Sequence, residues 1–350
     1  MRSPPLALAA LWGLMVPSQA PAQASGAEAG PPPAASRPPR APPGRSFGPL
    51  TTEEASPLQR ISFNHTVEGA DLLPRGTFQV EAWLGYSNIF EQDSTANHEL
   101  YIDMERMAKV FGVRWGVAQR LEVGGAVALE STGGGILDGF ITAWHRALGV
   151  GNANRDLYPD GAYGRRLRLG DVDVPFPDGP RAMALEDVRL FAKWEAWRSP
   201  DGRRLASLRG VARIPAEDQI GAGRVTDVSL MALGRASWTR WHLHGTVGGA
   251  TVRASRAWDA VMRSHAVFVD VAAERNLAPW VSGVVQLSAA SPRFKGLGDP
   301  ELDGWPVNVV FGVTGALRDG WRFDVSFQED IVPTSPAVDF TLGIGVRKRW

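Results

Sequence analysis

Cysteine is absent from the 350 residues, so disulfides, thiolate metal sites and cysteine nucleophiles are excluded. A net charge is also absent, because 37 basic residues balance 37 acidic ones. With no basic surplus to neutralise phosphates, a nucleic-acid partner is not expected. Beyond the N-terminus, no segment reaches the roughly 18 uninterrupted apolar residues of a membrane-spanning helix. What the chain has in excess is Trp, with thirteen residues against four Tyr.

The first 24 residues have the pattern of a secretory signal peptide. Arg2 gives a positive start, residues 6–16 form an apolar run, and Ala22-Gln23-Ala24 is an A-x-A cleavage site. Residues 25–45 contain seven Pro and little that is apolar, which is typical of an extended, disordered linker. We therefore expect export, followed by either a periplasmic tether or a leader without a specific role.

From Thr77 onward, apolar and polar residues alternate with a period of two. In Trp321–Phe327 the odd positions are aromatic or Val, whereas the even positions are Arg322, Asp324 and Ser326. This pattern is typical of strands with one apolar face, and it predicts an all-β fold. We expect about twelve strands, near residues 77–86, 100–117, 121–130, 186–197, 204–214, 226–238, 241–252, 262–274, 280–289, 306–317, 321–329 and 337–350. A change of parity near residues 106–109 predicts a bulge in the second strand or an end that stands above the membrane.

The predicted connections alternate in length. After every second strand they are short, at residues 118–120, 198–203, 239–240, 275–279 and 318–320, and the others are longer, up to residues 131–185. Short turns on one side and long loops on the other are typical of a transmembrane antiparallel up-and-down β-barrel. An even number of strands places both ends of the barrel, residues 77–350, on the periplasmic side of a bacterial outer membrane.

Tryptophan marks the short-turn side. Seven of the thirteen Trp residues lie beside a short turn or at the chain end, namely Trp115, Trp197, Trp238, Trp241, Trp280, Trp321 and Trp350. We expect them to form an interfacial girdle in contact with lipid, because such a ring would be a large exposed apolar patch in a soluble protein.

The last strand resembles the C-terminal signal by which outer-membrane barrels are handed to their assembly machinery. That signal has a terminal aromatic residue preceded by alternating apolar positions, here Phe340, Leu342, Ile344, Val346 and Trp350, while Lys348 departs from it. The resemblance implies outer-membrane lipid, the barrel assembly machinery and periplasmic chaperones as partners.

Three stretches, residues 103–105, 133–138 and 141–145, with Arg155 beyond them, are similar to an outer-membrane family described only as a domain of unknown function. The similarity covers roughly residues 47–350. It implies a barrel with a shared outer loop and brings no activity with it.

The long loop 131–185 contains one predicted helix. Its apolar residues fall at i, i+3, i+4, i+7 and i+11, which places them on a single stripe, and Asp138 and His145 lie along one flank. Two interpretations stay open: a lid whose Asp138 and His145 touch a solute, or a helix packed against the barrel rim with Asp138 stabilising its first turn. The stripe consists of Leu137, Phe140, Ile141, Trp144 and Leu148.

The alternation also predicts which charged side chains point into the barrel. Both signs are mixed among them, so the interior is either a narrow polar channel or a lumen sealed by its own ion pairs. The predicted inward residues are Glu122, Arg189, Lys193, Glu195, Arg209, Arg213, Asp227, Arg235, His242, His244, Asp270, Glu274, Arg322, Asp324, Asp339 and Arg347.

His242 and His244 are candidates for metal binding, and the turn at 239–240 sets Ser237 opposite His242. A barrel lipase needs its nucleophile at the outer leaflet, whereas this pair would face inward near the periplasm. No third group that could orient the pair is evident from the sequence. We favour structural histidines, and expect no catalytic residue, no metal and no cofactor.

Residues 46–76 precede the barrel. The stretch Ile61–Val67 alternates, so it is a thirteenth strand, a plug in the lumen or a periplasmic cap, and an even strand count favours the last two. The sequence as a whole favours passive passage or binding of a small solute, gated by the loop helix. A structural or adhesive protein with a sealed lumen is the second hypothesis, and a lipid-modifying barrel enzyme the third.

Overall fold

The computed structural model describes residues 44–61, 67–95, 98–149, 155–169, 172–174, 176, 179–216, 226–251, 260–298, 300–331, 338 and 340–350. The predicted signal peptide (1–24) lies outside this range, as do all but the last two residues of the predicted linker (25–45), the middle of Ile61–Val67, and Asp339. No helix among the described residues is long and apolar enough to cross a membrane.

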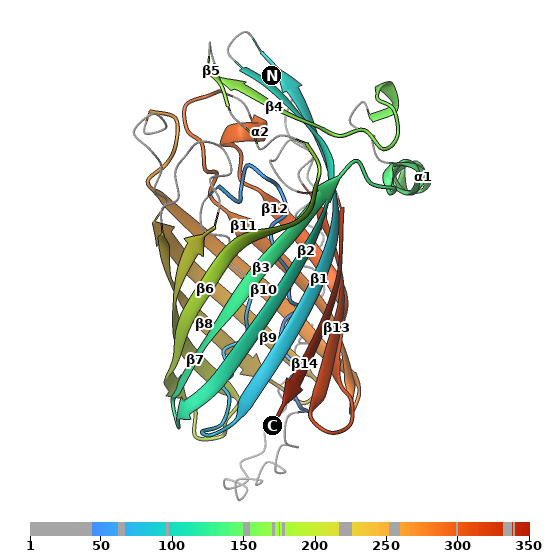
Figure 1. Ribbon diagram of the computed structural model, residues 1–350. Coiled ribbons are helices and arrows are strands. Elements are labelled where there is room, and N and C mark those ends of the chain that lie inside the picture. The colour runs from blue at the N-terminus through green and yellow to red at the C-terminus, as the bar shows by residue number, and fades with distance from the viewer. Residues whose placement is uncertain are drawn as a thin grey trace, which may run out of the picture. The chain divides into compact units, whose positions relative to one another are not determined.

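Within the described residues, twelve antiparallel strands close into a barrel, as the alternation predicted (Figure 1). Consecutive strands pair, and the last strand pairs with the first from Gln79↔Arg349 to Asn88↔Phe340. Between these pairs, closure leaves no open edge in the twelve-stranded wall. The strands are β1 (Phe78–Ser94), β2 (His98–Ala118), β3 (Leu121–Gly133), β6 (Arg181–Arg198), β7 (Arg204–Pro215), β8 (Asp227–Ser237), β9 (Trp241–Thr251), β10 (His265–Ala278), β11 (Val281–Ala290), β12 (Val307–Ala316), β13 (Trp321–Asp330) and β14 (Phe340–Arg349).

The first two strands extend beyond their predicted lengths. β1 and β2 pair in one unbroken register from Phe78↔Trp115 to Ser94↔Glu99, so no bulge lies near residues 106–109 in this pair. The two strands stand above the rest of the barrel in Figure 1 and pair there with β4 (Gly164–Leu169), which β5 (Val172–Asp173) continues. The parity change therefore reflects burial of both faces of β2 above the rim.

Three short elements complete the loops. Helix α1 (Asp138–Leu148) follows β3, a 3-10 turn spans Arg155–Leu157, and α2 (Pro300–Asp303) precedes β12. On the opposite side, Asp319 and Gly320 both have positive φ, 58° and 77°, as a type I′ hairpin turn requires.

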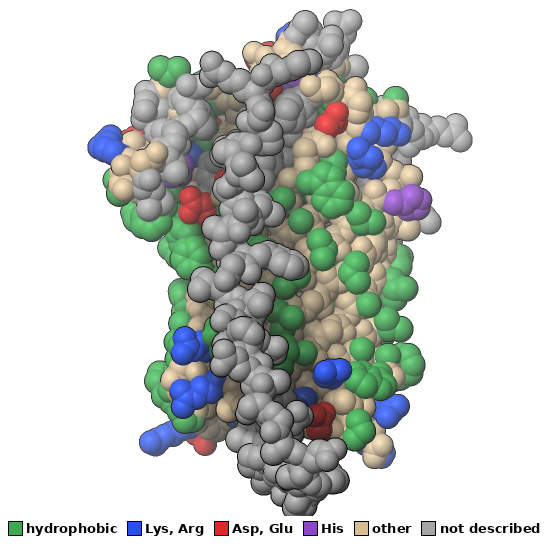
Figure 2. Space-filling model, turned by 180° about the vertical axis from the view of Figure 1, so that it is seen from behind, with side chains coloured by type: hydrophobic (Ala, Val, Ile, Leu, Met, Phe, Trp, Pro, Cys, Tyr) green, Lys and Arg blue, Asp and Glu red, His purple; other side chains and the backbone are tan. Residues whose placement is uncertain are grey.

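The outer wall of the barrel is apolar. Outward residues such as Val269 and Val271 on β10 and Leu342 and Ile344 on β14 are 44–55% exposed. Hydrophobic side chains spread over the wall in Figure 2, with Lys and Arg toward both ends. The seven predicted girdle Trp residues are 43–65% exposed at the short-turn end. Their contact with lipid stays a prediction.

A segment in front of β1 lies inside the barrel. It comprises the described residues 44–61 and 67–76, and we call it the luminal segment. Gly44 donates a hydrogen bond to Thr239 in the β8–β9 turn, and Gly76 donates one to Gly116 near the end of β2, so both ends lie on the short-turn side. Leu50, Ala55 and Leu58 are buried within it.

The exposed wall predicts where a charge is least tolerated. Arg in place of Phe311, which is 42% exposed near the middle of β12, should destabilise the barrel by about 2–4 kcal/mol, because the guanidinium would meet lipid hydrocarbon. Ile136→Arg, in the outer loop where Ile136 is 86% exposed, should cost under about 0.5 kcal/mol. Equal losses for the two variants in urea unfolding from lipid vesicles would contradict this orientation of the barrel.

Candidate functional site

The predicted inward side chains lie in the barrel interior wherever the structure describes them. Most are almost fully buried. Their exposed fractions include 6% for Arg189, 1% for Lys193, 6% for Arg209, 1% for Arg213, 1% for His242, 3% for His244, 2% for Asp270 and 1% for Asp324; Arg235, Arg322 and Arg347 are half-buried.

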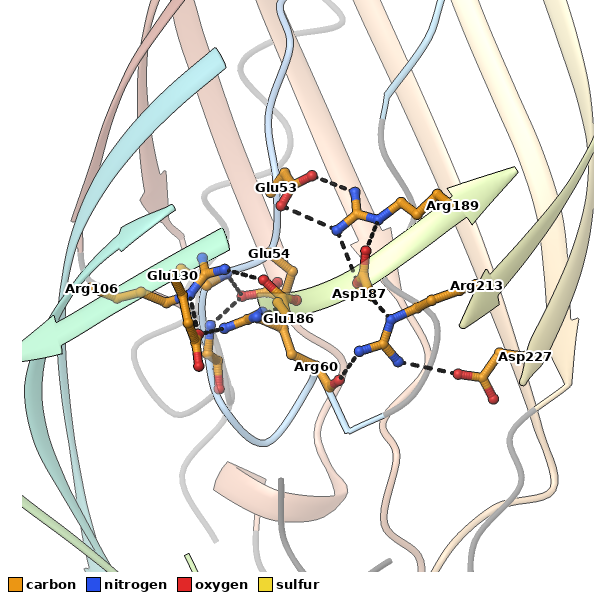
Figure 3. Close-up of polar contacts among 12 residues, drawn as sticks. Glu53, Glu54, Arg60, Arg106, Glu130, Glu186, Asp187, Arg189, Arg213 and Asp227 are labelled. Atoms are coloured by element: carbon orange, nitrogen blue, oxygen red, sulfur yellow. Dashed lines mark hydrogen bonds and ion pairs between the residues drawn. The ribbon is translucent and has the colours of Figure 1, made fainter. Parts of the chain in front are cut away.

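A four-residue ion cluster joins the luminal segment to the wall near the long-loop end (Figure 3). Arg60 of the luminal segment contacts Glu130 of β3 at 3.0 Å and also pairs with Glu186 of β6. Arg106 of β2 lies 3.1 Å from Glu130 and 2.7 Å from Glu186. All four side chains are at most 10% exposed, and their charges cancel. Balanced pairing is what allows this much charge to stay buried.

A second chain of ion pairs runs beside the first. Arg189 pairs with Glu53 of the luminal segment and lies 2.7 Å from Asp187. Asp187 also forms an ion pair with Arg213 at 2.8 Å, and Arg213 forms a second one with Asp227 at 3.2 Å. Figure 3 shows these side chains converging from β6, β7 and β8 on the luminal segment. This chain of ion pairs therefore ties the first half of the luminal segment to strands that are far from it in the sequence.

Nearer the short turns, one carboxylate holds three cations. Glu68 contacts Arg114 at 2.5 Å, Lys193 at 2.6 Å and Arg209 at 2.7 Å, and Glu122 shares the first two. Burial by itself raises the pKa of Glu68, but the three cations hold it well below its usual range. Glu68 is thus ionised throughout the physiological range.

The first residues of the luminal segment are tied to one buried acid. Glu274 of β10, with no exposed surface, accepts hydrogen bonds from the Ser46 hydroxyl and from the backbone of Phe47 and Gly48. His244 lies 3.0 Å from the same carboxylate. His244 therefore helps to fix the carboxylate that holds the luminal segment. Among the described residues, no cluster of His, Asp and Glu suits a metal ion.

A cavity of about 290 Å³ remains between the luminal segment and the wall. Phe47, Val67 and Leu73 of the segment face Trp83, Phe191 and charged residues of the strands across it. The interior is therefore neither solidly packed nor an unobstructed pore, because residues 44–61 and 67–76 occupy much of it.

Ser237, His242 and Asn276 form a chain of hydrogen bonds in the interior. The Ser237 hydroxyl lies 2.9 Å from His242 Nδ1, and the Asn276 side-chain oxygen lies 3.2 Å from His242 Nε2. Asn276 is the third group that the sequence did not reveal. It also donates to the backbone oxygen of Arg45, so the luminal segment covers the group from the inside. A position that faces the lumen near the short turns does not suit a nucleophile acting on outer-leaflet lipid.

The loop helix packs on the outside of the barrel. Phe140 stacks edge-on against Phe340 at 5.6 Å, and Trp144 lies 5.8 Å from Phe327, both on outward faces of β14 and β13. Ile141 is fully buried. Helix α1 therefore stands beside the barrel wall rather than across its mouth (Figure 1). The side chain of Leu148 lies outside the described residues.

Asp138 does not face a solute space, as the lid interpretation required. It is 4% exposed and accepts hydrogen bonds from Asn88 at 2.9 Å, Arg155 at 2.8 Å and the backbone of Gly161 at 2.7 Å. His145 is half-buried on the same helix. Asp138 thus joins β1 to α1, to Arg155 and to Gly161.

Glu105 completes this outer junction. It accepts hydrogen bonds from Tyr86 and from the backbone of Leu137. Its side chain lies directly beside Gly135, whose φ is +75°. A Cβ at Gly135 would lie 1.7 Å from the Glu105 carboxyl carbon. Residues 103–105, 133–138 and Arg155, which are far apart in the sequence, therefore meet at one place.

Sequence reasoning missed several members of the ion clusters. Glu130 has the same parity as Glu122, so the alternation could have found it. Glu186 could not be found in this way, because it is the extra residue of a β-bulge: Asp187 pairs with Ala128 and Leu185 with Leu129. The bulge turns both Glu186 and Asp187 into the interior, where both are buried.

A closed barrel with an apolar wall, short turns on one side and charged side chains inside is a transmembrane β-barrel of the outer-membrane type. A family model described as "Protein of unknown function (DUF3187)" matches residues 39–175 and 181–350. The chain belongs to this family, and the resemblance inferred from the sequence is confirmed.

No curated protein sequence matches the chain. Among solved structures, the NanC porin is 7% identical and has a TM-score of 0.42, over 76% of this chain and 98% of that one. The CymD monoaromatic hydrocarbon channel is 10% identical with a TM-score of 0.39, over 79% and 89%. The Pseudomonas putida toluene transporter TodX is 9% identical with a TM-score of 0.37, over 86% and 98%. Similarity at this level carries no argument about function.

The buried pairs predict a large cost for removing one partner. Arg60→Met should lower the free energy of unfolding by about 3–5 kcal/mol, because it leaves two buried carboxylates with one cation. Arg166→Met, which removes an exposed pair with Glu99, should cost at most about 1 kcal/mol in the same urea titration. Adding Glu186→Gln to Arg60→Met should restore part of the loss, and strict additivity would contradict the cluster.

The outer junction predicts opposite effects for two nearby glycines. Gly135→Ala should detach the loop and raise its protease sensitivity while the barrel still assembles, since its backbone has positive φ and its Cβ would clash with Glu105. Gly139→Ala meets nothing within 4 Å and should stabilise α1 by about 0.5–1 kcal/mol. Limited proteolysis of the folded protein distinguishes the two, and equal protection of both would contradict the junction.

Proposed function

We propose that this protein mediates passage of a small solute across the outer membrane, and that the described conformation is its closed state. The observation that carries the proposal is the luminal segment, which crosses a strand-lined, charged interior and leaves a cavity beside it. A barrel built only for mechanical stability would not need a polar interior with a separate segment threaded through it.

The chemistry of the contacts supports a segment that can move. Many of its attachments are ion pairs and hydrogen bonds, whose partners water or a polar solute can replace once it enters the lumen. Both ends of the segment lie at the short-turn side, so a released segment would withdraw toward the periplasm without crossing the barrel.

The outer end of the segment is held differently. Ala55 and Leu58 belong to a buried apolar cluster that includes Ile102 of β2, Met262 and Phe294 of the outer loops. Movement of those loops would expose or release the segment. We therefore assign the gate to the luminal segment under control of the outer loops.

The gating role that the sequence suggested for α1 is less well supported. The helix covers Phe340 and Phe327 on the outer wall, so its position suits fixing the outer loop. A structural or adhesive protein with a permanently sealed lumen is the second candidate, and the buried ion clusters are the observation that favours it. Export by residues 1–24, and assembly through Leu342, Ile344, Val346 and Trp350, remain proposals.

The gate is tested by locking it. Ser207 donates a hydrogen bond of 2.6 Å to the backbone oxygen of Ala70, and no natural cysteine competes, so Ala70→Cys with Ser207→Cys would link the segment to β7. In planar bilayers we expect the wild type and the reduced double variant to open intermittently, and oxidation of the double variant should abolish its openings reversibly. The single variant Ser207→Cys should not respond to oxidation.

The outcomes separate the two candidates. Conductance that persists unchanged in the oxidised double variant would show that the luminal segment is not the gate. Absence of conductance in the wild type, in the reduced variant and in Arg60→Met would favour the sealed structural protein.

A further inference from the structure

The cavity lies in the short-turn half of the barrel. Ser46, where the luminal segment begins, and Asp71 and Pro74, where it leaves, are among the lining residues. Asp71 and Pro74 are exposed, so the cavity reaches the short-turn side of the described structure. A solute could enter it from that side without passing the ion clusters near the long loops.

Positive charge dominates the lining. Seven Arg and Lys side chains and five acids border the cavity. Glu53, Glu68, Glu81 and Glu122 pair with the four lining cations on β2, β6 and β7, and Arg347 lies 2.6 Å from Asp324. Among the described residues, Arg322 and Arg349 form no ion pair. Both are half-buried and point inward.

The strand register forces these cations together. Arg322 on β13 pairs directly with Arg347 on β14, and Arg349 follows two residues later on the same inward face. Like charges opposite one another destabilise a sheet, and here only one of the three has a carboxylate partner. The barrel cannot separate them without changing register, so an anion between them would relieve the repulsion.

We propose that this cluster binds a small anion of the carboxylate or phosphate class. Guanidinium groups match the planar or tetrahedral oxygens of both, often through paired hydrogen bonds. At about 290 Å³ the cavity is at the lower end of small-molecule sites, which suits a short organic acid or a single phosphate group. The inference deepens the proposed function by naming the class of solute, although binding itself requires no passage.

Binding is tested on the full-length protein refolded in detergent, with inorganic phosphate and succinate as probes. Calorimetry at constant ionic strength should show saturable binding of each and competition between them. Arg322→Met and Arg349→Met should each weaken it at least about tenfold. The matched control is Arg318→Met, an exposed cation in the β12–β13 turn at the same end, which should leave binding unchanged.

A second measurement guards against variants that merely disturb the barrel. Phosphate should raise the melting temperature of the wild type and of Arg318→Met, but not that of Arg322→Met, whose own stability without phosphate should be equal to or above the wild type's. Equal binding by all three single variants, or no saturable binding by the wild type, would overturn the proposal. Binding without any conductance would overturn passage alone, and conductance without binding would overturn the anion site alone.

Discussion

Buried charge inside the barrel must be paired, and much of this molecule follows from that constraint. The inward faces of β6 and β7 place Arg189, Lys193, Arg209 and Arg213 where little water reaches them. The wall supplies some of the compensating acids, but Glu53 and Glu68 come from the luminal segment. The segment and the wall are thus complementary, and neither would be stable in this form without the other.

The same constraint determines how the luminal segment is held. An apolar plug would be held by a packed interface that only large displacement could break, whereas ion pairs can exchange with water one at a time. At the long-loop end, apolar packing of Ala55 and Leu58 also holds the luminal segment in place. At the short-turn end, Arg322 and Arg349 form no ion pair among the described residues, and there the interior has room for a ligand.

The outer loop is held by hydrogen bonds to two buried acids rather than by the ion clusters of the interior. Glu105 and Asp138 each accept several hydrogen bonds from groups that the extended β1–β2 pair brings within reach. Because this junction lies beside the barrel, α1 can rest on β13 and β14 without closing the mouth. The segments that resemble the family in the sequence build this junction rather than the interior.

The sequence by itself determined the barrel. A period of two fixes which residues of a strand face lipid, alternating loop lengths fix the sides, and an even number of strands permits closure, so the twelve strands, the exposed Trp residues and the inward charges could all be predicted. The period of two and the lengths of the loops can both be recognised from residues close together in the sequence, so neither depends on the tertiary structure.

The tertiary structure decided which charges meet. Pairing of Arg60 with Glu130 and Glu186 spans 70 residues or more, and the bulge that turns Glu186 inward breaks the period on which sequence reasoning relied. The place of α1 was also beyond the sequence, since an apolar stripe shows that a helix packs but not against which surface. Whether the lumen held water or protein depended on residues 44–61 and 67–76. Their place is set by contacts with strands far from them in the sequence, such as those with Glu274 of β10, Arg189 of β6 and Ser207 of β7.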